Sequence, residues 1–256
     1  MASWSTRRQL TYFFGFFAVV IAATAFFASA FWPRPSCSDG RRNQGELGID
    51  CGGVCHSVCS NEALPARALW ARVLPTGSPR FSEAGAGTYD LSALIRNPNP
   101  NLSAIHLPYE LKFVDQLNNT INTVRGEISL WPGEDYPIFI PNINAGKRIP
   151  TLAYIEFTGA PRWERATSTR PTLTITEDNF LNEPTPIIKA RLTNDSLEPV
   201  VKIAVIVLLS DADHNVFASY GTFVERLESK ATTDISFTWP HPFTAPPTFT
   251  EFYSHV

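Results

Sequence analysis

The sequence predicts a mainly β protein with one N-terminal transmembrane helix, a small disulfide-stapled knot and two tandem antiparallel β-sandwiches. Three observations support this fold class: a long uncharged stretch near the N-terminus, four cysteines confined to the segment after it, and a remainder of short apolar runs separated by Pro, Gly, Asn and Asp. The 256 residues accordingly divide into a stub 1–9, a helix 10–32, a Cys-rich motif 36–60 and two sandwiches, 65–160 and 171–256.

The uncharged stretch is long enough to cross a membrane. Residues 10–32 carry no charged side chain, and a helix needs about 20 apolar residues to span the hydrocarbon core. Arg7 and Arg8 lie directly before it in a short stub, and such a stub usually stays in the cytoplasm while the rest of the chain is exported. We therefore expect a single-pass protein of the cell membrane, with residues 10–32 in the lipid bilayer and the C-terminal domains outside the cytoplasm.

A second interpretation of this stretch is a cleaved signal peptide. Ala28, Ser29 and Ala30 form a small-x-small sequence of the kind that a signal peptidase accepts. The apolar run is longer than the roughly 7–15 residues of a typical signal peptide, which favours an uncleaved anchor. Both interpretations export residues 33 onward.

The four cysteines are predicted to form two disulfides. Cys37, Cys51, Cys55 and Cys59 are the whole cysteine content of the chain, and an even set in an oxidising compartment favours disulfides over free thiols. Their pairing stays open among three connectivities. A structural zinc site is the alternative, but neither short interval between the cysteines has the C-x2-C spacing of zinc knuckles.

Oxygen-bearing side chains and glycines fill the interval between the first cysteines. Asp39, Asn43, Glu46 and Asp50 alternate with Gly40, Gly45 and Gly48, and Ca²⁺ is held by six to eight oxygen ligands. These side chains predict a small calcium loop clamped by disulfides. The alternative is that the same residues only make tight turns and Asx caps, and His56 likewise has a metal-binding and a solvated-loop interpretation.

The segment "CSDGRRNQGELGIDCGGVC", residues 37–55, resembles a short cysteine-rich motif of exported and surface-attached bacterial proteins, commonly of the form CxDGxxNxxExGxDCGGxC. In bacteria with small genomes the motif often follows a single membrane span and precedes β-rich domains. The resemblance implies this topology and no chemical activity.

Twelve strands are expected after the motif, because short alternating runs bounded by turn residues are typical of antiparallel sandwiches. Their expected positions are 68–74, 89–96, 109–115, 123–130, 137–141 and 152–158 in the first sandwich and 172–176, 187–193, 200–209, 216–224, 233–239 and 248–253 in the second. The polar segment 159–171 is the expected linker.

The two sandwiches look like copies of each other. In both, an apolar strand stops in an Asn-containing turn, and the next strand ends at an aspartate: Asn97 lies 18 residues before Asp115, and Asn194 lies 17 before Asp211. A glycine within a strand and a strand that ends at a proline follow in each. This repeated order indicates an internal duplication.

The first sandwich carries a further resemblance. "YDLSALIRNPNPNLSAIHLPYELKF", residues 89–113, is similar to the late-embryogenesis-abundant type 2 β-sandwich, in which an N-P-N turn ends an early strand. The second sandwich departs from this turn with Asn194, Asp195 and Ser196. The resemblance implies a fibronectin-like, and thus immunoglobulin-like, sandwich that binds or supports, and it brings no catalytic residues.

No catalytic pattern stands out. The chain has no H-E-x-x-H, G-x-S-x-G or phosphate-loop sequence, and its net charge of −3 gives no reason to expect nucleic acid as a partner. Trp131 and Trp239 sit near turns, where they either form a contact platform for a sugar or protein or close a sandwich core. We therefore expect a non-enzymatic protein of the cell envelope, acting in envelope structure, adhesion or the binding of an extracytoplasmic protein or glycan. The alternative is an accessory carbohydrate- or calcium-binding surface module.

Overall fold

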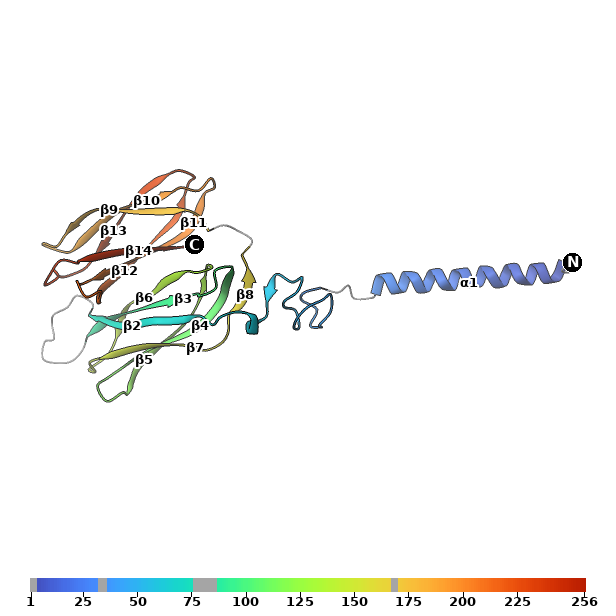
Figure 1. Cartoon of the computed structure of the whole chain (residues 1–256), viewed down its shortest axis with the longest axis horizontal. Helices are drawn as coiled ribbons and strands as arrows, with labels where there is room; N and C mark the ends of the chain where they lie inside the picture. The colour runs from blue at the N-terminus through green and yellow to red at the C-terminus, as the bar shows by residue number, and fades with distance from the viewer. Residues whose placement is uncertain (1–3, 32–35, 76–86, 167–169) are drawn as a thin grey trace. The chain divides into compact units, whose positions relative to one another are not determined.

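The computed structural model describes residues 4–31, 36–75, 87–166 and 170–256 (Figure 1). It is mainly β with one N-terminal helix and with disulfides in the Cys-rich motif, which confirms these parts of the predicted fold class. The chain divides into two compact units, residues 1–55 and 56–256. All of the strands lie in the second unit.

The first unit contains helix α1 (Trp4–Phe31) and the greater part of the Cys-rich motif. Within α1, Arg8–Ser29 is a 22-residue span with a mean hydropathy of 2.1, and none of its apolar window is buried against protein. By length and composition this helix is either a membrane span or a signal sequence. Residues 1–3 of the predicted stub and residue 32 of the predicted span lie outside the described ranges.

The second unit begins with a set of strands that we call the first module, residues 57–165. One sheet has the order β2-β3-β6, and the other has the order β1-β8-β4-β5 with β7 also paired to β4; all of the pairs are antiparallel. The elements are β1 (Ser57–Val58), the 3₁₀ turn η1 (Ser60–Glu62), β2 (Arg67–Pro75), β3 (Thr88–Arg96), β4 (Leu102–Val114), β5 (Thr120–Leu130), β6 (Asp135–Asn144), β7 (Leu152–Phe157) and β8 (Arg162–Arg165).

The second module, residues 173–255, has two antiparallel sheets of three strands each, β13-β10-β9 and β12-β11-β14. Its strands are β9 (Leu173–Leu181), β10 (Ile187–Asn194), β11 (Val200–Ser210), β12 (Val216–Leu227), β13 (Thr232–Thr238) and β14 (Phe249–His255). All twelve strands expected from the sequence are present, several of them longer than predicted.

The predicted linker 159–171 needs correction, because part of it is strand β8. Trp163 in β8 pairs with Val58 of β1 and Ala104 of β4, and it is only 2% exposed. The run "RWER" has one large apolar residue among charges and resembles a surface loop, but burial of the indole makes it part of the sheet. Residues 167–169 of the same segment lie outside the described residues.

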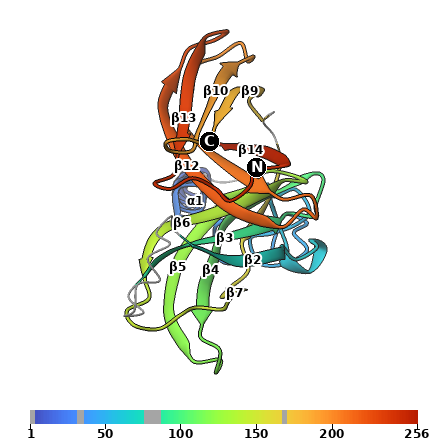
Figure 2. The ribbon, with the colours of Figure 1, turned by 90° about the vertical axis from the view of Figure 1, so that its left-hand side faces the viewer.

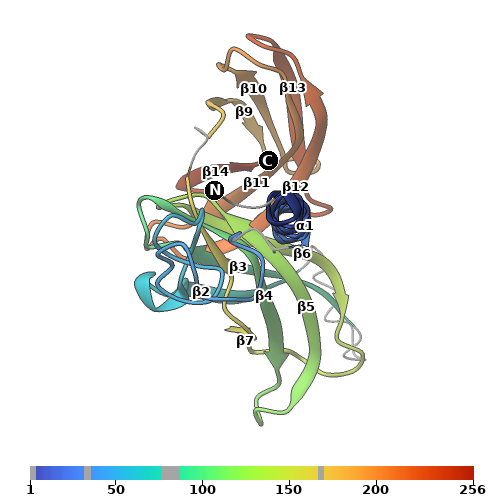
Figure 3. The same cartoon turned by 90° about the vertical axis from the view of Figure 1, so that its right-hand side faces the viewer.

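The two modules have the same topology, which supports the predicted duplication. The strands of the first module are counted from β2 and those of the second from β9. In both modules the first, second and fifth strands form one sheet, and the fourth, third and sixth strands form the other. Figure 2 shows the resulting layers, with β9, β10 and β13 above β11, β12 and β14, and the first module below them. Figure 3 shows the same succession from the opposite side.

Asn97 is the hub of the first module. Its side chain is completely buried at the turn after β3. The side-chain amide donates to the carbonyl oxygens of Leu102 (2.6 Å) and Trp131 (2.9 Å), and its own oxygen accepts from the Asn99 N–H at 3.0 Å. One side chain thus ties the end of β3 to the start of β4 and to the end of β5.

Asn194 occupies the equivalent place at the end of β10 and makes the equivalent bonds. It is also completely buried. Its amide donates to the carbonyls of Glu198 (2.9 Å) and Leu227 (3.1 Å), and its oxygen accepts from the Ser196 N–H at 2.9 Å. The N-P-N turn is therefore not essential to this hub, since the second module builds the same hydrogen bonds around an N-D-S turn.

The aspartates predicted to correspond also match. Asp115 accepts the N–H groups of residues 117 and 119 in the β4–β5 turn, at 3.0 and 2.9 Å. Asp211 accepts those of residues 213 and 215 in the β11–β12 turn, at 3.0 and 2.8 Å. These bonds lower the pKa of both carboxyl groups, because they favour the charged form. Each module thus has one buried asparagine and one turn aspartate in equivalent places, and their hydrogen bonds hold the turns that join its strands.

Strand β11 is buried on both faces. Val205, Val207 and Leu209 point into the core of the second module, whereas Ile206 and Leu208 belong to a buried cluster that also holds first-module side chains. That cluster includes Leu74, Ile95, Tyr136 and Ile138 of the first module. The sheet β12-β11-β14 therefore packs between the two cores, and the modules share buried apolar surface instead of being separated by a linker.

Polar contacts reinforce this junction. The Arg72 guanidinium donates to the Val216 carbonyl at 3.3 Å and to the Asn215 side chain at 3.1 Å. Glu134, with its side chain only 1% exposed, lies 3.0 Å from the Arg170 guanidinium and 3.5 Å from the His255 ring nitrogen. A buried carboxylate of this kind needs its partners, because an unpaired buried charge is costly.

We predict that residues 56–256 unfold in one cooperative step and that Leu208→Ala lowers the free energy of unfolding by about 2–5 kcal/mol, the usual cost of truncating a buried leucine. Val201→Ala, on the same strand but 46% exposed, is the matched control and should change it by under about 0.5 kcal/mol. Chemical denaturation measures both. Two separate transitions in the parent chain would show that the modules are independent.

The asparagine hubs generate a second prediction. Asn97→Ala and Asn194→Ala should each lower the free energy of unfolding by about 2–3 kcal/mol, because each change leaves several buried backbone groups without a partner. Asn101→Ala, at an exposed position beside the first hub, should be close to neutral in the same denaturation experiment. A large loss at Asn97 with none at Asn194 would argue against equivalent hubs.

Candidate functional site

All four cysteines of the motif are disulfide-bonded, as predicted. Cys37 pairs with Cys55 across a Cα–Cα distance of 5.7 Å, and Cys51 and Cys59 are also in disulfide linkage. Zinc is bound by thiolates, and a sulfur in a disulfide is not a thiolate. The oxidised motif therefore lacks the thiolate ligands that a structural zinc site requires.

Two of the predicted calcium ligands accept hydrogen bonds within the loop. Asp39 accepts from the Arg41 N–H at 2.9 Å and from the Asn43 side-chain amide at 2.7 Å. The bond from Asn43 is the main reason that the pKa of Asp39 lies below its usual value. Asp50 accepts from the Gly40 N–H with both oxygens, at 3.0 and 3.1 Å. These bonds are those of a loop in which carboxylates cap turns.

Glu46 lies inside the loop and is only 3% exposed. Its carboxylate accepts from the N–H of Asn43 at 3.2 Å and of Asp50 at 3.4 Å, and it lies 3.2 Å from the Cys55 sulfur. Gly53 allows this close packing: a Cβ there would come within 2.1 Å of the Gly45 carbonyl oxygen, and its φ is +58°. Any side chain at position 53 would push this carbonyl aside.

Among the described residues, Asp39, Glu46 and Asp50 do not form a group of carboxylate oxygens within 4.8 Å of one another. The group of three ligand atoms lying within 4.8 Å of one another consists of Cys37, Glu46 and Cys55, and its two sulfurs are disulfide-bonded. The side-chain oxygen of Asn43 is buried and has no donor among the described residues, so it remains an open acceptor beside Asp39. Calcium binding by Asp39, Asn43, Glu46 and Asp50 stays a prediction.

The two tryptophans predicted to form a contact platform lie apart. Trp239 is 7% exposed and belongs to the core of the second module. Its ring N–H donates to the Ser219 carbonyl at 3.3 Å. Trp131 is half-buried and lines a different cavity from Trp239. The binding role of both residues stays a prediction, and the structure places them at two separate sites.

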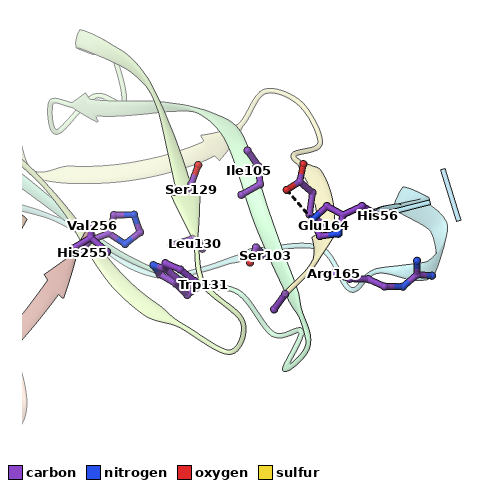
Figure 4. Close-up of a pocket in the computed structure, with 11 residues that line it drawn as sticks. His56, Ser103, Ile105, Ser129, Leu130, Trp131, Glu164, Arg165, His255 and Val256 are labelled. Carbon is purple, nitrogen blue, oxygen red and sulfur yellow. Dashed lines mark ion pairs between the residues drawn. The ribbon is translucent and has the colours of Figure 1, made fainter. Parts of the chain in front are cut away.

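Trp131 lines a small cavity of about 200 Å³ that first-module residues form together with His255 and Val256 at the end of β14, shown in Figure 4. His56 and Glu164 lie at one end, with a nitrogen–oxygen distance of 3.4 Å, and His255 lies at the other. Ser103 and Ser129 also line it. Among the described residues no hydrogen bond joins a serine hydroxyl to an imidazole here, so this cavity does not present an assembled nucleophile and base.

A larger cavity of about 490 Å³ lies where the modules meet, and we call it the inter-module groove. The first module supplies strand residues from β3 and β6, and the second supplies residues from β12, β13 and the adjoining loops. The lining residues are Asp90, Phe139, Pro141, Asn142, Thr185, Tyr220, Thr238, Trp239 and Pro240. Of these residues, the sequence predicts a binding role for Trp239.

No protein-family model matches the chain, and comparison with curated proteins finds no match in sequence.

The turn-capping bonds of Asp50 generate a prediction. Asp50→Ala removes both acceptors of the Gly40 N–H, so hydrogen exchange of the segment around Gly40 should rise about tenfold, the effect of losing about 1.4 kcal/mol of local stability. Asp50→Asn keeps one acceptor oxygen and should exchange at an intermediate rate. Mass spectrometry of the exchanging chain measures both, with calcium and with a chelator.

If Asp50 only caps turns, the hydrogen-exchange rates around Gly40 are the same with calcium and with a chelator. Calcium-induced slowing that Asp50→Ala abolishes would contradict the turn interpretation and favour an ion site.

Proposed function

We propose that this chain is a non-enzymatic protein of the cell membrane that displays two joined β-modules outside the cytoplasm, where they bind a partner or support the envelope. The observation that carries this proposal is the order of parts: an apolar span at Arg8–Ser29, then disulfide-bonded cysteines, then β-modules. Disulfides persist in oxidising compartments, which supports export of everything after the helix.

The two resemblances support the same proposal. The cysteine motif resembles one from exported bacterial proteins with this order of parts, and the first module resembles late-embryogenesis-abundant type 2 sandwiches. Each module consists of a three-stranded sheet and a second sheet, and the strand order is equivalent in the two modules. This arrangement is compatible with fibronectin-like and immunoglobulin-like domains. These are folds that commonly serve binding, although a fold alone does not define a function.

The joined modules are suited to presenting a binding surface to a partner. The Glu134 contacts and the two-sided burial of β11 favour one orientation of the modules. Binding surfaces built from both modules are then pre-organised, which lowers the entropic cost of binding. Such a pair holds a composite surface at a membrane without needing any catalytic group.

The proposed anchor makes a prediction. Val19→Arg places a charge in the apolar span, at a cost of about 3 kcal/mol on insertion scales, and should move much of the chain out of the membrane fraction. Val19→Leu is the matched control and should stay in that fraction. Fractionation with immunodetection, together with the intact mass of the chain, makes the measurement.

An intact mass that includes residue 1, in membranes that resist alkaline washing, supports the anchor. A soluble exported chain that begins after Ala30 would contradict the anchor and leave export in place.

A further inference from the structure

The inter-module groove has fixed aromatic walls. Phe139 and Tyr220 are half-buried, one from each module, and their ring centroids lie 6.2 Å apart. Trp239 holds Tyr220 in an edge contact at 5.7 Å, and Phe139 packs over Gly221, where a Cβ would come within 3.2 Å of its ring. These contacts pre-organise the rings, which is what a binding surface needs.

The groove also offers polar groups that the fold does not use. Thr185, Thr238 and Asn142 are exposed, and their side chains make no hydrogen bond with any other described residue. The Tyr220 hydroxyl likewise has no partner among the residues that the structure describes. Hydroxyl and amide groups both donate and accept, so the groove is able to pair with ligand groups of either kind.

The charge of the described groove lining disfavours anionic ligands. Asp90 is the charged residue among those that line it, is 6% exposed, and accepts the Asn142 N–H at 2.8 Å. None of the described residues that line the groove is a Lys, Arg or His. Phosphate, nucleic acid and anionic lipid are recognised through such cations, so the described lining favours an uncharged ligand over these classes.

We propose that the inter-module groove binds a neutral sugar. Its volume of about 490 Å³ lies within the range of roughly 300–1,000 Å³ typical of small-molecule sites. A neutral sugar has an apolar C–H face that packs on aromatic rings and hydroxyl groups that pair with Thr, Asn and Tyr side chains. Both requirements are met here by residues from the two modules together. This proposal rests on the proposed function only in that export brings the groove to extracytoplasmic glycans.

The test uses the full chain in phosphatidylcholine nanodiscs, because alkyl maltoside detergents carry a neutral sugar themselves. Maltotriose, cellotriose and triacetylchitotriose are titrated one at a time, and binding is followed by saturation-transfer NMR and calorimetry. We expect saturable binding of at least one of them. Tyr220→Ala should weaken it about tenfold or more, the effect of losing about 1.4 kcal/mol of ring contact.

Phe223→Ala is the matched control, since it removes a 56% exposed ring from the same strand outside the groove. It should leave the affinity unchanged. If Tyr220→Ala fails to fold, Tyr220→Phe and Thr238→Val test the polar contacts with the rings in place, and each should weaken binding severalfold.

Absence of binding to all three trisaccharides, or equal binding by the parent chain and Tyr220→Ala, overturns the proposal. So does binding of a proline-rich decapeptide in place of the sugars, because aromatic grooves also hold such peptides. None of these results affects membrane fractionation, so failure of the groove proposal and failure of the anchor are distinguishable.

Discussion

The packing of β11 on two sides is the constraint on which the rest of the second unit depends. A strand in an ordinary antiparallel sandwich buries one face and exposes the other, but β11 is nearly fully buried from residue 203 to residue 210. One face closes the core of the second module, and the other packs against buried side chains of the first. The junction brings Phe139 to Tyr220 and creates the inter-module groove. A single buried strand thereby links the stability of the two modules to a surface that both of them build.

Much of this fold was accessible from the sequence. The strands are bounded by turn residues, and the repeated Asn and Asp positions identified the duplication because these residues bond to nearby backbone groups, at 97 and 194 and at 115 and 211. The run "IAVIVLLS" at 203–210 is apolar almost throughout and does not alternate with polar residues. A continuous apolar run of this kind indicates a strand that is buried on both faces. That signal predicts that the modules share an interface, whereas the polar segment at 159–171 suggested a linker.

The parts that could not be predicted depend on contacts between distant residues. The segment "PGED", which contains Glu134, is typical of a surface turn. The Glu134 carboxylate is nevertheless buried against Arg170 and against His255, 121 residues away. β8 is short and charged, yet it pairs with β1 and β4 and buries Trp163. The groove could not be predicted from the sequence either, because Phe139 and Tyr220 share no sequence pattern and come together only through tertiary packing. In the Cys-rich loop, the residue types were compatible with both an ion and turn capping, and hydrogen bonds to Asp39 and Asp50 became visible only in the structure.

We predict that the two modules move as one rigid body. The most direct measurement is the distance between spin labels in the full chain by double electron–electron resonance, with labels on Asn122→Cys of β5 and Lys189→Cys of β10, two exposed positions in different modules. The native cysteines are oxidised, so the labels react with the introduced thiols. Rigidly joined modules give a single narrow distance distribution. A broad or multimodal distribution would show that the modules move independently and would contradict this prediction.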